Sequence, residues 1–193
     1  MRFAFENIAR HTRRYPIAFA VLVAAAFLLY AKSFSNQWTY DDFSVLVQNP
    51  DIRSIAGFFE DQRSGRPARE LSYLIDYQFF KLNPAGYHLQ NIFWHGLNAF
   101  LIFTLVGLFC NDQRIAWTAA LLFLVHPVQV EVVAQVSHRK DSIVLALCLM
   151  AFICWIKAFQ SANRHWPWLL SSAILGVSAY FAKQNALALP VVL

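Results

Sequence analysis

The chain has 193 residues, of which 58% are hydrophobic and only 14% are charged, and its formal net charge is +5. Soluble domains carry about a quarter charged residues, so this composition excludes an ordinary soluble fold and predicts an integral membrane protein. The cations are scattered between apolar runs, which argues against nucleic acid and favours the lipid bilayer as a partner. The three cysteines lie in or beside apolar runs, so neither a disulfide framework nor a zinc site is indicated.

The apolar runs predict an all-α integral membrane protein, a multi-span helical bundle, because barrel strands would alternate and be about half as long. The first run, residues 16–34, follows several arginines, which predicts a cytoplasmic N-terminus; a cleaved signal peptide is the competing interpretation. Further spans are predicted at 88–109, 115–133, 142–159 and 166–182, with a partial span from 186. Eight residues of helix cover only about 12 Å, so residues 1–193 are expected to be one truncated membrane domain.

Residues 35–87 form a long polar segment, which alternation of the spans places on the outer side. Turn signals at Asn49-Pro50-Asp51 and Ser64-Gly65-Arg66-Pro67 divide it, and residues 71–82 have the spacing of a short amphipathic helix at the interface. Eight Lys and Arg residues would lie outside, against the positive-inside rule. Either the topology differs or these cations serve a polar site on the outer face of a plasma-type membrane, such as a bacterial inner membrane.

Two adjacent carboxylates, Asp41 and Asp42, stand just beyond the first span in the sequence Trp38-Thr39-Tyr40-Asp41-Asp42-Phe43. Neighbouring like charges repel, so water, a cation or a basic ligand must compensate them, and such positions are often where chemistry is done. The pair is therefore a candidate active-site motif in the outer loop.

A polar stripe recurs in the second predicted span, where His88, Asn91, His95 and Asn98 follow at steps of three, four and three. At about 100° per residue these side chains share one helix face. Polar groups are costly in lipid, so the stripe is predicted to face the bundle interior or a wet cavity. Interhelical hydrogen bonding is the plainer interpretation, and a metal site made by the two histidines alone is disfavoured because they lie about 10 Å apart.

A second polar cluster begins at His126 and ends in the run Ser137-His138-Arg139-Lys140-Asp141. Pro127 is predicted to kink the third span and to turn His126 and Glu131 toward the bundle axis. Arg139 and Lys140 would pair with the acid or hold a phosphate. An ordinary charged turn between two spans is the alternative.

An ordered series of motifs extends from about Trp38 to the C-terminus. It includes Tyr40-Asp41-Asp42, Asn49-Pro50-Asp51, Leu71-Ser72-Tyr73, Asp76-Tyr77, Gly86-Tyr87-His88, His126-Pro127-Val128, Val130-Glu131 and Arg139-Lys140-Asp141. The series resembles the membrane part of the transmembrane and tetratricopeptide-repeat O-mannosyltransferases and their bacterial relatives, within the GT-C class of glycosyltransferases.

The resemblance implies a membrane enzyme that transfers a sugar, mannose by the family's name, from a polyprenyl-phosphate donor to an acceptor hydroxyl on protein at the outer face. It implies an essential acid in the first outer loop, here Asp41 or Asp42, and a second at Glu131, with Asp141 a weaker candidate. The chain departs from the family pattern at Ala182-Lys183-Gln184, where relatives often have Ser-Lys-Glu.

The chemistry follows from these roles. One carboxylate would deprotonate or orient the acceptor, and Glu131 would assist it or bind a divalent cation as a cofactor. The donor phosphate would be steadied by cations: Arg139, Lys140, His126 and Lys183. Two other interpretations remain, a carrier or flippase for lipid-linked saccharide and a non-catalytic membrane fragment; a carrier would tolerate loss of the Asp pair.

Overall fold

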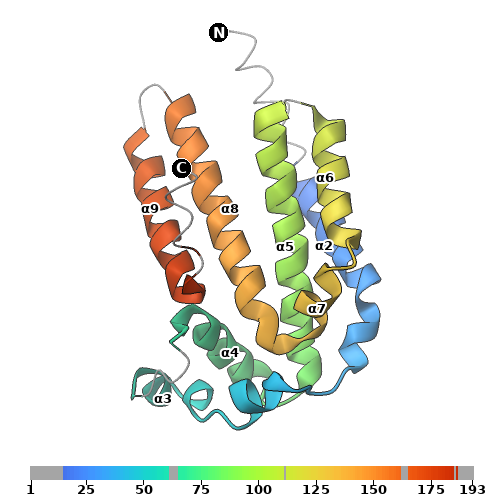
Figure 1. The fold of residues 1–193 in the computed structure, drawn as a ribbon, viewed down its shortest axis with the longest axis vertical. Helices are drawn as coiled ribbons and strands as arrows, with labels where there is room; N and C mark the ends of the chain where they lie inside the picture. Colours follow the sequence, from blue (N-terminus) through green and yellow to red (C-terminus); the bar gives the residue numbers. More distant parts are fainter. Residues whose placement is uncertain (1–14, 61–64, 111, 162–164, 185, 187–193) are drawn as a thin grey trace.

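The computed structural model describes residues 15–60, 65–110, 112–161, 165–184 and 186, and within these ranges every regular element is a helix (Figure 1). The predicted all-α class is therefore confirmed. The α-helices are α2 (Tyr15–Leu29), α3 (Ile55–Glu60), α4 (Pro67–Phe80), α5 (Pro84–Cys110), α6 (Gln113–Val125), α7 (Gln129–Ala134), α8 (Arg139–Gln160) and α9 (His165–Ala182). Short 3-10 or π turns complete the chain: η1 (Ala31–Ser35), η2 (Phe43–Val47), η3 (Asp51–Arg53) and η4 (Val136–His138).

Helix α5 is the centre of the bundle, with α2 and α6 against it on one side and α8 on another, while α9 packs on α8 (Figure 1). Small residues allow the close approach of α2 and α5. A Cβ on Gly96 would stand only 2.8 Å from the Cα of Val23, and Ala26 lies beside it. Close contact through small residues is how helices gain packing energy where lipid supplies no hydrophobic drive.

Among the residues that the structure describes, two segments are long and apolar enough to cross a membrane, namely Pro84–Cys110 and Val136–Gln160, and the apolar helices α2 and α6 are shorter. The predicted span 115–133 is not one helix: α6 ends at Val125 and α7 begins at Gln129. Pro127 has no backbone N–H and holds the preceding His126 in an extended conformation, so the chain breaks rather than kinks. Of the predicted partial span from 186, only Ala186 lies within the described residues.

Helix α4 lies across the lower end of the bundle, where it contacts α5, α8 and α9 (Figure 1). Its inner face buries three charged side chains, Arg69, Glu70 and Asp76. Its outer face exposes Leu71, Ile75 and Phe79 at four-residue steps. This arrangement is the reverse of a surface helix in a soluble protein, because the charges face inward and the apolar stripe faces outward.

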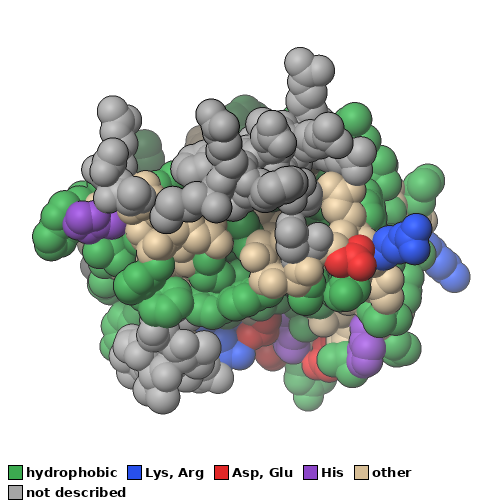
Figure 2. Space-filling model, turned by 90° about the horizontal axis from the view of Figure 1, so that it is seen from above, with side chains coloured by type: hydrophobic (Ala, Val, Ile, Leu, Met, Phe, Trp, Pro, Cys, Tyr) green, Lys and Arg blue, Asp and Glu red, His purple; other side chains and the backbone are tan. Residues whose placement is uncertain are grey.

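Apolar side chains also dominate the outer surface of the other helices. Leu28 of α2, Phe109 of α5 and Trp166 of α9 are 81%, 63% and 73% exposed. From the end of the bundle opposite α4, hydrophobic side chains make up most of the surface that the described residues form (Figure 2). Soluble monomers rarely expose apolar patches of this extent, so the surface is suited to an apolar surrounding.

Candidate functional site

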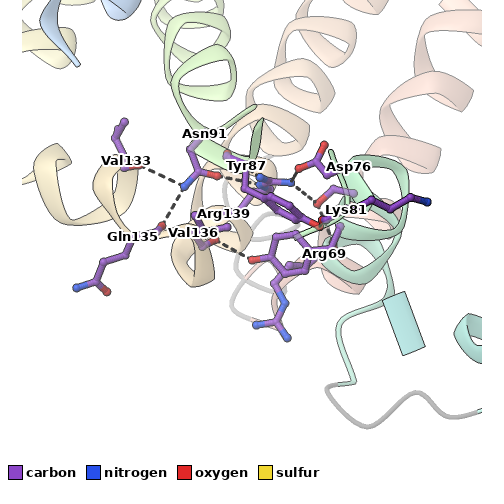
Figure 3. Close-up of polar contacts among 11 residues, drawn as sticks. Arg69, Asp76, Lys81, Tyr87, Asn91, Val133, Gln135, Val136 and Arg139 are labelled. Carbon is purple, nitrogen blue, oxygen red and sulfur yellow. Dashed lines mark hydrogen bonds and ion pairs between the residues drawn. The ribbon is translucent and has the colours of Figure 1, made fainter. Parts of the chain in front are cut away.

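Arg139, the first residue of α8, is completely buried and stands among polar groups of α4 and α5 (Figure 3). Its Nε donates to Asn91 Oδ1 at 2.8 Å, its Nη1 to Asp76 Oδ2 at 2.5 Å and its Nη2 to the Tyr87 carbonyl at 2.8 Å. The guanidinium also lies 4.8 Å from the centre of the Tyr73 ring. We call this set, Tyr73, Asp76, Tyr87, Asn91 and Arg139, the buried polar core.

The buried polar core contains an ion pair, Arg139 with Asp76, that is removed from water. Burial raises the pKa of Asp76, and the Arg139 guanidinium opposes that rise. Burial likewise raises the pKa of Tyr73, whose hydroxyl donates to the Val136 carbonyl at 2.7 Å. The sequence led us to expect that Arg139 would hold a phosphate. In the structure its N–H groups bond to protein and no part of its side chain reaches solvent, so Arg139 is not placed for that role.

The stripe on α5 is buried along its whole length, and three of its four members bond to main-chain carbonyls. Asn91 Nδ2 donates to the carbonyls of Val133 at 3.2 Å and Gln135 at 2.9 Å. The other two bonds join His95 to the Leu124 carbonyl at 3.2 Å and Asn98 to the Ser142 carbonyl at 2.9 Å. The stripe thus supplies hydrogen-bond donors to carbonyls at or near helix ends. Without such donors, these carbonyls would be costly to bury away from water.

His88, the remaining member of the stripe, is completely buried, and neither of its ring nitrogens has a hydrogen-bond partner among the described residues. The Asp42 carboxylate and the Arg139 guanidinium both lie within electrostatic range of the ring. His88 is therefore a buried polar side chain near both Asp42 and Arg139 of the buried polar core.

Asp42 is buried and joins two distant parts of the chain. Its Oδ1 accepts the backbone N–H of Ser137 at 2.8 Å, and its Oδ2 accepts the backbone N–H and the hydroxyl of Thr39 at 3.1 and 3.2 Å. Three donors compensate the charge of a carboxylate that no solvent reaches. Asp42 thus ties the first loop to the turn before α8, and we call these contacts the Asp42 clamp.

Asp41 has the opposite environment. It is exposed, and its carboxylate has no hydrogen-bond or ion-pair partner in the part of the chain that the structure describes; only its backbone carbonyl is used, by the Ser44 hydroxyl at 3.0 Å. The preceding residue, Tyr40, is 91% exposed and has a φ of 41°. A positive φ costs energy for a residue with a Cβ and persists only where the surroundings impose it. The clamp two residues further on supplies that restraint.

Glu131 and His126 do not turn toward the bundle axis, which corrects the expectation drawn from Pro127. The Glu131 side chain is 68% exposed and lies 4.0 Å from Nδ1 of His138, which is also 4.0 Å from Asp141. His126 is exposed at a shallow apolar hollow lined by Phe123 and Val128, and its Nδ1 accepts the Val128 N–H at 3.3 Å. The broken helix removes the kink that would have aimed both residues inward.

Cations gather where α4, α8 and α9 meet. Lys183 forms an ion pair with Asp141, and Lys140 Nζ donates to the Ser137 carbonyl at 3.1 Å. Arg66 and Arg69 also lie within electrostatic range of Lys140. We use the name polar rim for half-buried or exposed charged groups of the first loop, α7, η4 and the neighbouring ends of α8 and α9, namely Asp41, Glu131, His138, Lys140, Asp141 and Lys183.

Sequence reasoning missed several residues that the structure makes central. Thr39 and Ser137 hold Asp42, while Arg69 and Glu70 form a buried ion pair at 2.7 Å, with Asn49 Nδ2 donating to Glu70 at 2.9 Å. One available signal was Asp76, an acid placed on the helix face opposite Leu71 and Ile75, because a buried acid needs a cation. Among the described residues, no group of three or more His, Cys, Asp or Glu side chains is placed to hold a metal ion.

Comparison with known proteins gives relatives among curated sequences. The chain is 28% identical over 184 residues to Protein O-mannosyl-transferase Tmtc1 of Drosophila melanogaster, covering 85% of this chain and 21% of that protein. It is 29% identical over 195 residues to Protein O-mannosyl-transferase TMTC1 of Mus musculus, covering 88% and 21%, and 27% identical over 201 residues to TMTC4 of Homo sapiens, covering 86% and 27%. The predicted resemblance is confirmed, and the chain spans between about a fifth and a quarter of the length of these relatives. No family model and no solved structure matches the chain.

Proposed function

We propose that this chain, as a relative of proteins named O-mannosyl-transferases, forms the part of a membrane glycosyltransferase that presents the catalytic carboxylate. The donor is a polyprenyl-phosphate sugar, mannose by analogy with those names, and the acceptor is a hydroxyl on protein. Support comes from similarity over more than four fifths of the chain and from the exposed carboxylate of Asp41, which has no hydrogen-bond or ion-pair partner among the described residues and lies beside the Asp42 clamp. That contrast between neighbouring acids is the observation that carries the proposal.

The same proposal includes a topology. Residues 16–34, 88–109, 115–133, 142–159 and 166–182 cross or enter a plasma-type membrane, such as a bacterial inner membrane, with a cytoplasmic N-terminus. Residues 35–87 then lie on the outer side, with α4 at the interface and its exposed Leu71, Ile75 and Phe79 toward lipid. The two long apolar segments and the apolar outer surface support this arrangement.

In the proposed reaction the acceptor oxygen attacks the anomeric carbon of the sugar while the bond from that carbon to the phosphate oxygen breaks. The Asp41 carboxylate takes the proton of the hydroxyl, and the polyprenyl phosphate leaves with the bonding electrons. A phosphodiester is a good leaving group, so no acid is required. Positive charge grows on the sugar ring and negative charge on the phosphate, so cations beside the phosphate stabilise the transition state.

The polar rim supplies the cations for this role. Lys140 and Lys183 are only partly buried, and Arg66, within electrostatic range of Lys140, adds positive charge without being required to touch the donor. Glu131 lies on the same rim, near His138, and we assign it the role of orienting the acceptor. His126 is exposed beside an apolar hollow, where we assign it a contact with the lipid side of the donor.

The test uses membranes containing the protein, given polyprenyl-phosphate [³H]mannose and peptides rich in serine and threonine. Asp41→Asn is expected to lower the transfer rate by a factor of about 10² to 10⁴, as loss of a general base does. The matched control is Asp112→Asn, an exposed acid that caps α6 and can still do so as an amide.

Two results would overturn the proposal. Absence of transfer by the unaltered protein would contradict the enzyme, and so would equal rates for the unaltered protein and Asp41→Asn. If mannolipid instead crosses sealed vesicles at a rate that Asp41→Asn does not change, the protein is a carrier.

A further inference from the structure

Arg139 lies one residue beyond η4, the turn that holds Asp42. That turn is held from two sides by the buried polar core. From α5, Asn91 Nδ2 bonds the carbonyls of Val133 and Gln135, while Asn91 Oδ1 accepts from Arg139. From α4, the Tyr73 hydroxyl bonds the Val136 carbonyl. The amide of the next residue, Ser137, is the one that donates to Asp42.

These contacts form a continuous path from Arg139 to the exposed acid. Arg139 fixes the Asn91 amide, and both fix the turn at residues 133–138 (Figure 3). The Ser137 N–H in this turn fixes the Asp42 carboxylate at 2.8 Å. Asp42 then holds the first loop, in which Tyr40 keeps its positive φ and Asp41 is exposed to solvent.

We propose that Arg139, with Asp76 as its counter-ion, is a positioning residue for the Asp41 carboxylate and not a ligand of the donor. This inference rests on the proposed function for its kinetic test, but its structural test does not. A displacement of about 1 Å at a reacting group costs on the order of 10²-fold in rate, so a support a few contacts away can control turnover.

Lysine cannot replace Arg139 in this role. Its ammonium is a single point charge and would pair with Asp76, but it cannot at the same time reach Asn91 Oδ1 and the Tyr87 carbonyl, which the planar guanidinium does. A phosphate ligand, in contrast, tolerates lysine well because phosphate binds point charges. Arg139→Lys therefore separates the two roles.

The kinetic experiment compares neighbouring positions in membranes containing the protein, with polyprenyl-phosphate [³H]mannose as the donor probe. Arg139→Lys is expected to lower kcat by a factor of about 10 to 100, as a small misplacement of a reacting group does, with the donor KM within about twofold. Lys140→Met is the matched control on the rim. It is expected to raise the donor KM by about tenfold or more, because one charge-assisted contact with the donor phosphate is lost. A raised donor KM with unchanged kcat in Arg139→Lys would overturn the positioning role.

The structural experiment measures backbone hydrogen exchange on the purified protein and needs no activity. In Arg139→Lys, amides of residues 133–138 are expected to exchange about tenfold faster or more, while α9 keeps its protection. A tenfold increase corresponds to a fall of about 1.4 kcal/mol in the free energy of local opening. Unchanged exchange in that turn would overturn the proposal even if transfer is never observed. Should Arg139→Lys fail to fold, Ser137→Pro removes the amide that bonds Asp42 and leaves Arg139 in place; an unchanged kcat in that variant would equally overturn it.

Discussion

In the buried polar core, one guanidinium meets a carboxylate, an amide and a carbonyl, and Arg139 and Asp76 have no exposed side-chain surface. In the polar rim, acidic and basic side chains remain partly or wholly exposed, and the Asp41 side chain has no polar partner among the described residues. The adjacent pair Asp41 and Asp42 divides between the two conditions. The comparison teaches that a charged residue in this fold is not by that fact a candidate for catalysis or binding. The buried, hydrogen-bonded groups stabilise the helix packing, and we call them the frame, whereas the exposed groups are available to a ligand.

The largest expected effect is on the frame. Arg139→Ala would leave Asp76 buried without its cation, and breaking a buried pair in this way costs about 3 to 5 kcal/mol of unfolding free energy. Denaturant unfolding in detergent micelles measures the loss. Arg114→Ala, at an exposed position of α6, serves as the control and should change stability by less than about 0.5 kcal/mol. A loss below about 1 kcal/mol at Arg139 would show that the buried polar core is not the frame.

The acidic pair offers the next contrast. Asp42→Ala removes the acceptor of the Ser137 and Thr39 amides and should cost about 1 to 3 kcal/mol, because buried donors are left unsatisfied. Asp41→Ala removes no polar side-chain contact with the described residues and should leave the melting temperature within about a degree. Thermal unfolding of both variants measures the difference. Equal destabilisation by the two substitutions would erase the distinction between the clamp and the exposed acid.

A smaller effect is expected inside the bundle. Asn98→Ala deletes one hydrogen bond from α5 to the Ser142 carbonyl, and single interhelical bonds in membrane proteins contribute about 0.6 to 1.7 kcal/mol. Thr104→Ala is a suitable control, because its hydroxyl bonds the Phe100 carbonyl within the same helix. If the two variants unfold at the same denaturant concentration, the stripe does not join the helices energetically.

The smallest effect should have the opposite sign. Tyr40→Gly replaces a residue held at φ 41° with one that tolerates this conformation, so stability should rise by as much as about 1 kcal/mol. Tyr40→Ala removes the ring but keeps the unfavourable φ and is the matched control. In thermal unfolding, the glycine variant should have the higher melting temperature of the two. A glycine variant no more stable than the alanine variant would show that the loop relaxes and that the clamp does not impose the strain.

Local patterns in the sequence were the most predictive. The buried face of α5 follows from the spacing of His88, Asn91, His95 and Asn98, because helical periodicity depends only on neighbouring residues. The all-helical class follows from the apolar runs in the same way. The break at Pro127 was predicted to be a kink, since the sequence does not show whether neighbouring elements will compensate the freed carbonyls.

Long-range partners could not be predicted. Asp42 and Ser137 are 95 residues apart, and nothing in either segment specifies the other. The cluster at Arg139 was predicted to be polar, with Arg139 and Lys140 either pairing with Glu131 or holding a phosphate, whereas Arg139 pairs with Asp76 of α4. Which of two adjacent cations turns inward depends on the first turn of α8, where Arg139 faces α5 and Lys140 faces the rim. That orientation arises from packing, not from residue type.

The bonds of the α5 stripe have one further consequence, for how the sequence can vary. Each bond joins a particular side chain on α5 to a main-chain carbonyl of the partner, at Leu124, Val133, Gln135 or Ser142. A carbonyl is present whatever residue carries it, so the partner positions are free to exchange among side chains of fitting size. Saturation mutagenesis should therefore give an asymmetric tolerance map, in which Asn91 and Asn98 accept almost nothing while Gln135 and Ser142, their bonded partners, accept many substitutions.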